Sequence, residues 1–225
     1  MHIIQPSVEI EDQDWDLMLR RIEKKGRVCY KSEDRITDTS AAAFVAMLNK
    51  SGHLSVLEHG SMSIKFTVDR GISHELARHR VASPSQESTR YCNYGNDDKG
   101  ITVIKPFFFP PSSDIDSLQY YTWLTSCEAS EFAYLELLRL GATPQEARDV
   151  LVNSLKTEMW ITANMREWSN VIFPQRCSPK AHPQMRQAMI PTLLKMKTLV
   201  PAIFAEVPYD TRFNPEHYAS VAIVA

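Results

Sequence analysis

The segment from Arg78 to Arg90 reads RHRVASPSQESTR and concentrates side chains that bind anions. It contains three arginines, four hydroxyl groups, one amide and one carboxylate, and its apolar content is limited to Val81 and Ala82. A guanidinium group makes paired, permanently charged hydrogen bonds to phosphate, and hydroxyl groups supply further donors. A single arginine is more often a solvated or ion-paired residue. The cluster instead favours a local phosphate site, to which more distant arginines can contribute: Arg148, Arg166 and Arg176.

Other common nucleotide, metal and nucleophile motifs have no match in this chain. The seven glycines form neither GxGxxG nor GxxxxGK[ST], which excludes a Rossmann turn and a P-loop. His53 and His59 lie close together, but no matching Cys or His pair follows, so we expect no bound metal. No base is evident beside any cysteine, which favours small core residues over nucleophiles at Cys29, Cys92, Cys127 and Cys177.

Amphipathic patterns predict the elements that position these residues. Side chains alternate between apolar and polar over Ser61–Asp69, which indicates a half-buried strand. Arg70–Arg80 has helical spacing, and we expect a loop from Arg80 onward. Thr157–Asn164 is compatible with a strand or with a helix.

Further elements complete an α+β chain, which we interpret as a single domain over residues 1–225. Thr143, Pro144 and Glu146 form the pattern of a capped helix start, and this helix carries Arg148. Helical spacing also occurs at Trp15–Lys25, Thr39–Lys50, Asp114–Leu140 and His182–Ala205, with breaks expected at Pro191 and Pro201. Short strands are predicted at His2–Ile4 and Ala219–Val224.

The composition narrows the class of protein. Of the 225 residues, 44% are hydrophobic and 23% are charged, which excludes fibrous and disordered chains. The formal net charge of -2 provides no global positive field, so we expect no nucleic-acid partner. The sequence shows no leader peptide and no apolar run long enough to span a membrane. The four cysteines are widely spaced with no CxxC pair, which is typical of reduced thiols. We therefore expect a cytoplasmic protein, or one in the host cytoplasm if the source is viral, with no membrane contact.

Several separated motifs resemble one enzyme family. Arg78-His79-Arg80, followed after seven residues by Ser88, matches the RHRx7S signature of the flavin-dependent thymidylate synthases. The segments GHLS at 52–55 and EH at 58–59 resemble the family's upstream element, and RVCY at 27–30 resembles its early helix end. Ala147-Arg148, TANMREW at 162–168, RCS at 176–178 and HPQMR at 182–186 resemble the downstream elements in the same order.

The resemblance implies an α+β fold with a central, mostly antiparallel sheet flanked by helices, and the reductive methylation of dUMP to dTMP. In that reaction methylenetetrahydrofolate gives the carbon, NADPH reduces bound FAD, and no cysteine nucleophile is needed. The implied FAD contacts are Ser55, Arg78, His79, Arg80, Gln86, Asn164, Met165, Arg166 and Asn170. The implied dUMP contacts are Glu75, Leu76, Ala77, Arg78, Gln86, Glu87, Ser88, Thr89, Arg90, Arg148 and Arg176.

Arg176 is the residue that the resemblance makes catalytic, because a guanidinium beside the uracil ring stabilises negative charge developing on the base. His53 is expected to lie over the flavin. The resemblance also implies a homotetramer with shared active sites. We weigh two alternatives against this function: a folate-dependent pyrimidine nucleotide hydroxymethylase of the same fold, and a noncatalytic module that binds single-stranded nucleic acid through the arginine-rich segment.

The chain departs from the family pattern at three points. Pro84 stands where the family commonly has an aromatic residue. The segment from Asn164 to Arg176 is one residue longer than the usual spacing, and Asn170 stands where many relatives have histidine. These departures bear on the shape of the arginine-rich segment Arg78–Arg90 and on the alignment of the segment that ends at Arg176.

Overall fold

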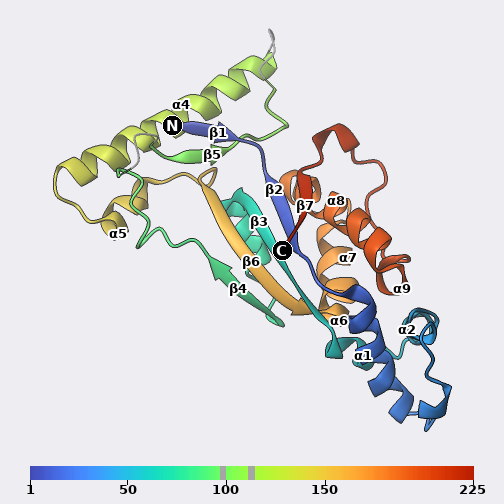
Figure 1. Ribbon diagram of the computed structural model, residues 1–225. Coiled ribbons are helices and arrows are strands. Elements are labelled where there is room, and N and C mark those ends of the chain that lie inside the picture. The colour runs from blue at the N-terminus through green and yellow to red at the C-terminus, as the bar shows by residue number, and fades with distance from the viewer. Residues whose placement is uncertain (97–99, 111–114) are drawn as a thin grey trace. The chain divides into compact units, whose positions relative to one another are not determined.

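The computed structural model describes residues 1–96, 100–110 and 115–225, and its internal contacts divide the chain into two compact units (Figure 1). Unit 1 comprises Met1–Ser7, Phe66–Arg78 and Ser85–Met159. Unit 2 comprises Val8–Lys65, His79–Pro84 and Trp160–Ala225. The assignment of the chain to one domain stays a prediction.

A five-stranded sheet has the order β4-β6-β3-β2-β7. Its strands are β4 (Ala82–Gln86), β6 (Lys156–Asn164), β3 (Ser61–Asp69), β2 (Ser7–Glu11) and β7 (Ser220–Val224). The Ser63 and Thr162 hydroxyls are 2.9 Å apart, and the Met165 N–H donates to the Gly60 carbonyl, so β3 and β6 are antiparallel. Figure 1 shows β2 and β7 running in the same direction. The predicted α+β class with a central, mostly antiparallel sheet is confirmed.

Strand β3 shows why these residues form a sheet with one buried face. Met62, Ile64, Phe66 and Val68 are buried, whereas the residues between them are partly exposed. A period of two places alternate side chains on opposite faces of a strand. The pattern that predicted this strand therefore also sets which face forms the core.

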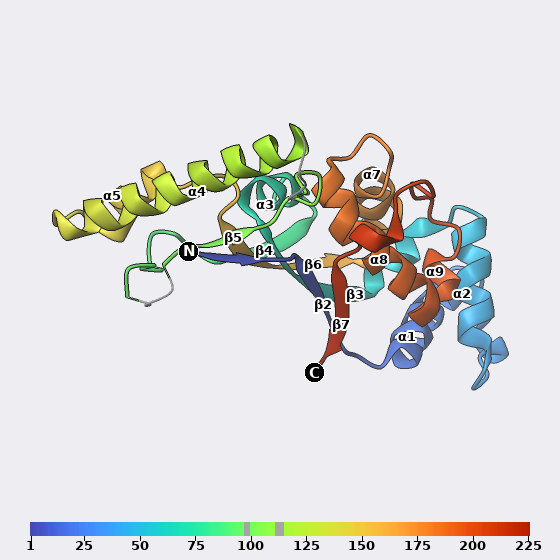
Figure 2. The ribbon, with the colours of Figure 1, turned by 90° about the horizontal axis from the view of Figure 1, so that it is seen from above.

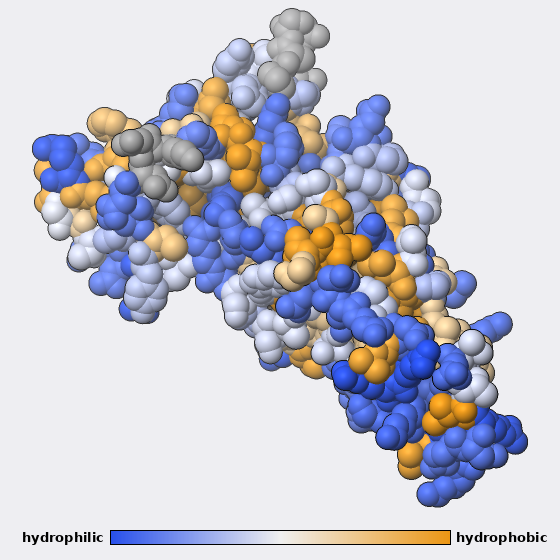
Figure 3. All heavy atoms as spheres, in the orientation of Figure 1, coloured by the Kyte–Doolittle hydropathy of each residue, from blue (hydrophilic) through white to orange (hydrophobic). Residues whose placement is uncertain are grey.

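Helices gather beside β2, β3 and β7 in unit 2 (Figure 2). They are α1 (Trp15–Val28), α2 (Ser40–Lys50), α6 (Met165–Glu167), α7 (Phe173–Arg176), α8 (Pro183–Leu199) and α9 (Pro201–Phe204). Fully buried Trp168 packs against Phe173, which packs edge-on against Phe204. The Trp168 indole N–H also donates to the Met62 carbonyl at 3.2 Å and so joins this helical layer to β3. The surface over α1 and α2 is largely hydrophilic (Figure 3).

Unit 1 has its own core beside a small parallel ladder. Strand β1 (His2–Ile4) pairs in parallel with β5 (Thr102–Ile104), next to the helix α4 (Ile115–Arg139). The buried cluster is Ile101, Val103, Cys127, Tyr134, Ala147 and Leu155. Unit 1 also contains α3 (Arg70–Leu76) and α5 (Pro144–Ala147). Among the described residues, no helix has both the length and the apolar character needed to cross a membrane.

The structure corrects several predicted elements. The segment after Arg80 is not only loop, because Ala82–Gln86 forms β4 at the edge of the sheet, where a polar, exposed strand containing proline is tolerated. Helix α3 already ends at Leu76. Pro191 lies inside α8 without ending it, whereas Pro201 does begin a new helix. Arg148 begins a 3₁₀ turn directly after α5.

Other predictions are confirmed or completed. Thr157–Asn164, left open between strand and helix, lies within β6. The capped helix start at Thr143 is present with both of its reciprocal hydrogen bonds to Glu146. The end strands lie at the predicted positions, and β2 and β5 were not predicted. Helix α4 begins at Ile115, and the predicted first residue Asp114 lies outside the described residues.

Candidate functional site

In unit 1, the chain leaves the sheet at Gln86 and turns immediately. The Gln86 amide donates to the Ser73 hydroxyl at 2.8 Å and to the Thr157 hydroxyl at 3.1 Å. The Ser88 carbonyl then accepts from the Tyr91 and Cys92 N–H groups, which closes a tight turn. We call residues Gln86–Arg90 the substrate loop, because each of its residues is a predicted dUMP contact.

Arg148 joins this loop from a distant part of the chain. Its guanidinium Nη1 lies 3.5 Å from the hydroxyl of buried Thr89, 59 residues away in sequence. Arg90 is exposed and lies over the Tyr91 ring, with 5.6 Å from the guanidinium carbon to the ring centroid. Two of the predicted phosphate-binding arginines are therefore on or against the substrate loop of unit 1.

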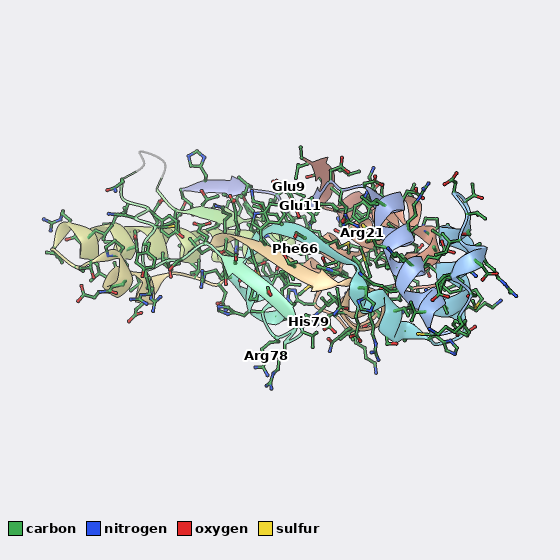
Figure 4. All side chains as sticks on the ribbon, turned by 60° about the horizontal axis from the view of Figure 1, so that its bottom comes forward. Glu9, Glu11, Arg21, Phe66, Arg78 and His79 are labelled. Carbon is green, nitrogen blue, oxygen red and sulfur yellow. The ribbon has the colours of Figure 1, made fainter. Side chains whose placement is uncertain are left out.

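Four further predicted dUMP contacts lie at the end of helix α3 and directly after it, and they differ in exposure. Arg78 is exposed and its side chain extends away from the ribbon (Figure 4). Glu75 is half-buried and Ala77 is exposed. Leu76 is fully buried.

In unit 2, the predicted catalytic Arg176 is hydrogen bonded to His79, and His79 in turn faces Glu167. Arg176 Nε donates to His79 Nε2 at 2.9 Å, although 97 residues separate the two in sequence. Burial, followed by the charge of Arg176, lowers the pKa of His79 from 6.5 to about 4. His79 is therefore neutral at pH 7, and an accepting Nε2 requires its proton to be on Nδ1. Nδ1 lies 3.9 Å from Glu167 Oε1, and burial raises the pKa of this carboxyl.

A second part of unit 2 forms a pocket of about 530 Å³ around predicted flavin contacts. Ser55 and Arg166 line it together with His53, Tyr30 and Cys29, among others. The Arg166 guanidinium is held by an ion pair of 2.6 Å to Glu58. Tyr30 stacks against His53, and its hydroxyl is hydrogen bonded to His53 Nδ1. Hydroxyl, guanidinium and aromatic groups are a donor set that fits a flavin and its phosphates.

The remaining predicted flavin contacts are not all directed to this pocket. Asn164 caps α6, because its side-chain oxygen accepts from the Glu167 N–H at 2.8 Å. Met165 is fully buried, and Arg80 is exposed. Asn170 lines a different, smaller pocket of about 180 Å³ together with Asn49 and Glu206.

The four cysteines do not share one environment, which corrects the prediction that all are core residues. Cys127 and Cys177 are buried, and burial raises the pKa of each thiol, that of Cys127 to about 11. Cys92 is partly exposed, and Cys29 is exposed at the end of α1 and borders the 530 Å³ pocket. Cys177 directly follows Arg176, but its thiol is not poised to act as a nucleophile.

Comparison with known proteins decides the family. The family model described as thymidylate synthase complementing protein matches residues 14–202. A flavin-dependent thymidylate synthase of Mycobacterium sp. (strain JLS) is 33% identical over 207 residues, which cover 82% of this chain and 78% of the relative. The enzyme of that name from Geobacter sulfurreducens is 30% identical over 187 residues, with 80% and 78% covered. The chain belongs to the flavin-dependent thymidylate synthase family.

A solved structure supports the family's fold. The UMP/dUMP methylase PolB from Streptomyces cacaoi, bound with 5-Br dUMP, superposes with a TM-score of 0.73 at 19% identity. The match covers 91% of this chain and 96% of that chain. The α+β arrangement of this family member is therefore shared over almost the whole length of both proteins.

The segment before Arg176, which is predicted to be one residue longer than the family's usual spacing, contains an irregular helical turn. Trp168–Ile172 forms a π-helix between α6 and α7. A π-helical turn contains one more residue than an α-helical turn, so an insertion can be absorbed there while both flanking helices continue. The predicted extra residue thus coincides with a local widening of the helix.

Residues that sequence reasoning did not single out also support the site. Glu167 faces His79, and Glu58 pairs with Arg166. Tyr94 and Lys156 both contact the Glu87 carboxylate. The family motifs include Glu58 and Glu167 only as parts of longer elements, and no sequence signal links Tyr94 or Lys156 to Glu87.

Proposed function

We propose that this family member catalyses the reductive methylation of dUMP to dTMP, with bound FAD, NADPH as reductant and 5,10-methylenetetrahydrofolate as carbon donor. The observation that carries the proposal is the pairing of Arg176 with a neutral, buried His79. Because a neutral acceptor does not offset the charge of the guanidinium, Arg176 keeps its full positive charge to stabilise negative charge on the substrate. The adjacent Cys177 thiol is buried with a raised pKa, in agreement with chemistry that uses no cysteine nucleophile.

The substrate loop and Arg148 are proposed to bind dUMP. Arginine forks suit a phosphate monoester, and hydroxyl and backbone groups of the loop suit the edge of a pyrimidine. The solved structure of PolB, a UMP/dUMP methylase, contains 5-Br dUMP, which supports a uridine nucleotide as the ligand of this shared fold. Arg148 is already directed to Thr89 at 3.5 Å, so little reorganisation is needed to bind the nucleotide phosphate.

FAD is proposed to bind at the 530 Å³ pocket of unit 2. Ser55 and Arg166 would hold its polar groups, and His53 would lie against its ring system. A bound flavin supplies the hydride that completes the methyl group. Glu58 fixes the Arg166 guanidinium beside the pocket through their 2.6 Å ion pair. The relatives named flavin-dependent thymidylate synthase support a flavin here.

The active form is proposed to be a homotetramer. Helix α4 exposes large apolar side chains on its surface: Leu118 is 65% exposed, Tyr121 57% and Phe132 72%. Such groups are uncommon in close succession on the surface of a monomer and are typical of protein interfaces. Flavin retention and activity measured over a dilution series test this proposal, and a fully active monomer contradicts it.

The reaction is tested on the purified protein under anaerobic conditions. We expect a visible flavin spectrum that NADPH bleaches, faster when dUMP is present, and dTMP identified by mass spectrometry after methylenetetrahydrofolate is added. A colourless protein that takes up no FAD overturns the proposal, and a hydroxymethylated product replaces it with the alternative enzyme. Arg176→Ala should lower kcat by about 10²–10³-fold, as for loss of one charge-stabilising donor, while FAD content stays near that of the wild type.

A further inference from the structure

The Glu87 carboxylate in the middle of the substrate loop is held at both of its oxygens. Lys156 Nζ donates to Oε2 at 2.8 Å, and the Tyr94 hydroxyl donates to Oε1 at 2.9 Å. The Lys156 and Glu87 side chains are only 20% and 16% exposed. Hydrogen bonds with an ionised partner are stronger than neutral ones, and partial burial weakens competition from water. Glu87 is therefore fixed in one position.

Neighbouring groups keep Lys156 and Tyr94 in the protonation states in which they donate to Glu87. Lys156 also lies 3.1 Å from Glu158 Oε1, and the Glu87 N–H donates to the Glu158 carbonyl at 2.9 Å. Burial alone would lower the pKa of Lys156, but the carboxylates of Glu87 and Glu158 raise it above its usual value. Burial and the Glu87 carboxylate raise the pKa of Tyr94. Lys156 thus remains an ammonium and Tyr94 a protonated donor at neutral pH.

The loop is fastened to strand β6 from both faces. Lys156 and Thr157 are successive residues of β6, so their side chains point to opposite faces of the strand. Gln86 ends β4, and Glu87 directly after it donates its N–H to the Glu158 carbonyl of β6. On one face Gln86 donates to Thr157, and on the other Lys156 donates to Glu87. Because both contacts lie within unit 1, the start of the loop has little freedom to rotate or to slide along the strand.

We propose that Lys156 and Tyr94 are positioning residues for the nucleotide, acting through Glu87. They hold the loop so that Gln86 and Ser88, on either side of Glu87, keep the geometry needed to bind the pyrimidine. They also fix and neutralise a carboxylate that would otherwise repel the phosphate of the nucleotide. This inference rests on the proposed function, since it takes dUMP as the ligand of the loop.

The test measures dUMP binding by calorimetry together with steady-state kinetics of the FAD-loaded enzyme. Lys156→Met should raise Kd and KM for dUMP about tenfold, the loss typical of one charge-assisted hydrogen bond, while kcat changes by less than about twofold. Tyr94→Phe should raise KM less, because the ammonium still holds Glu87. FAD content should not change. The matched control is Arg139→Met, which removes an exposed ion pair with Glu136 in the same unit and should leave KM unaltered.

A double-variant cycle separates positioning from a general structural effect. If Lys156 acts through Glu87, Lys156→Met should change KM by less than about twofold in the Glu87→Gln background. Additive effects, an unchanged KM in both single variants, or a fall in kcat alone would overturn the positioning role. If Lys156→Met does not fold, Tyr94→Phe and the conservative Lys156→Arg, which should rescue KM, decide the question. A wild-type enzyme that binds no dUMP overturns the proposed function itself, a result visible before any variant is compared.

Discussion

The buried His79 should make the stability of this protein depend on pH in a defined window. Its pKa is about 4 in the folded protein, against 6.5 for an ordinary histidine. Between these two values the unfolded chain binds a proton at this position and the folded chain does not. Stability rises with pH wherever the unfolded state binds more protons, so the folded state must lose stability as the pH falls from about 6.5 to about 4. Above pH 6.5 the contribution is constant.

The size of the effect follows from the two pKa values. One pKa unit corresponds to about 1.36 kcal/mol, so the full difference is about 3 kcal/mol at pH 4 and about 2 kcal/mol at pH 5. His79→Gln removes the titration but keeps an acceptor close to the place of Nε2, where Arg176 donates. The wild type should therefore lose about 2 kcal/mol more than His79→Gln when the pH is lowered from 7 to 5.

The assay is urea unfolding of the flavin-free protein at pH 7, 6 and 5, followed by tryptophan fluorescence. Comparison with the variant cancels contributions from ionisable groups remote from residue 79. The exposed His59 provides the control, since His59→Gln should retain the pH dependence of the wild type. Equal losses in the wild type and His79→Gln would refute a neutral, buried His79. The same protonation would remove the acceptor of Arg176, so kcat/KM should show no acid limb from this group above about pH 5.

Three further changes have defined outcomes. Cys177→Ala should retain turnover within a few fold, because the thiol is buried with a raised pKa; loss of activity with FAD still bound would assign it a chemical role. Thr143→Ala should lower the free energy of unfolding by about 1 kcal/mol in urea titrations, since it breaks the reciprocal cap with Glu146, and no change would mean that the cap is replaced by water. Glu58→Gln should weaken FAD retention by no more than about fivefold in flavin fluorescence titrations, because an exposed ion pair such as that with Arg166 contributes about 1 kcal/mol or less. A complete loss of FAD would show that Glu58 itself contacts the cofactor.

Sequence patterns predicted the elements whose formation depends on residues close together in the chain. The alternation over Ser61–Asp69 predicted β3 residue by residue, because the period of two and the burial of one face have the same cause. The cap at Thr143 was also predictable, since its partner Glu146 is three residues away. Strand β4 was not, because its polar sequence is compatible with pairing only at the edge of a sheet, which the sequence alone does not reveal.

The sequence predicted which residues belong to the candidate site, but not which of them contact one another. Motif resemblance marked His79 and Arg176 separately, but their hydrogen bond joins residues 97 positions apart and depends on the tertiary packing of unit 2. The neutral state of His79 follows from burial, which no motif encodes. Lys156 has no motif at all, and its role at Glu87 is visible only once two strands are paired.

The one-residue insertion predicted before Arg176 and the π-helix found in the same segment together yield a final prediction. The π-helix Trp168–Ile172 contains the residue that an α-helix would not need, and Val171 is exposed there, whereas Trp168 and Ile172 are fully buried. Deletion of Val171 should convert this turn to α-helix without rotating the buried residues on either side. Arg176 should then still reach His79.

We therefore expect the Val171 deletion variant to fold with unchanged or slightly higher stability and to keep dTMP formation within about tenfold of the wild type. Deletion of Gln175 is the matched control, because it lies in α7 beyond the widened turn and shortens the chain directly before Arg176. A residue removed there turns the following position by about 100° around the helix, so this variant should lose activity as severely as Arg176→Ala. If the Val171 deletion is the more damaging of the two, the widened turn is itself required to present Arg176, and the insertion is part of the site.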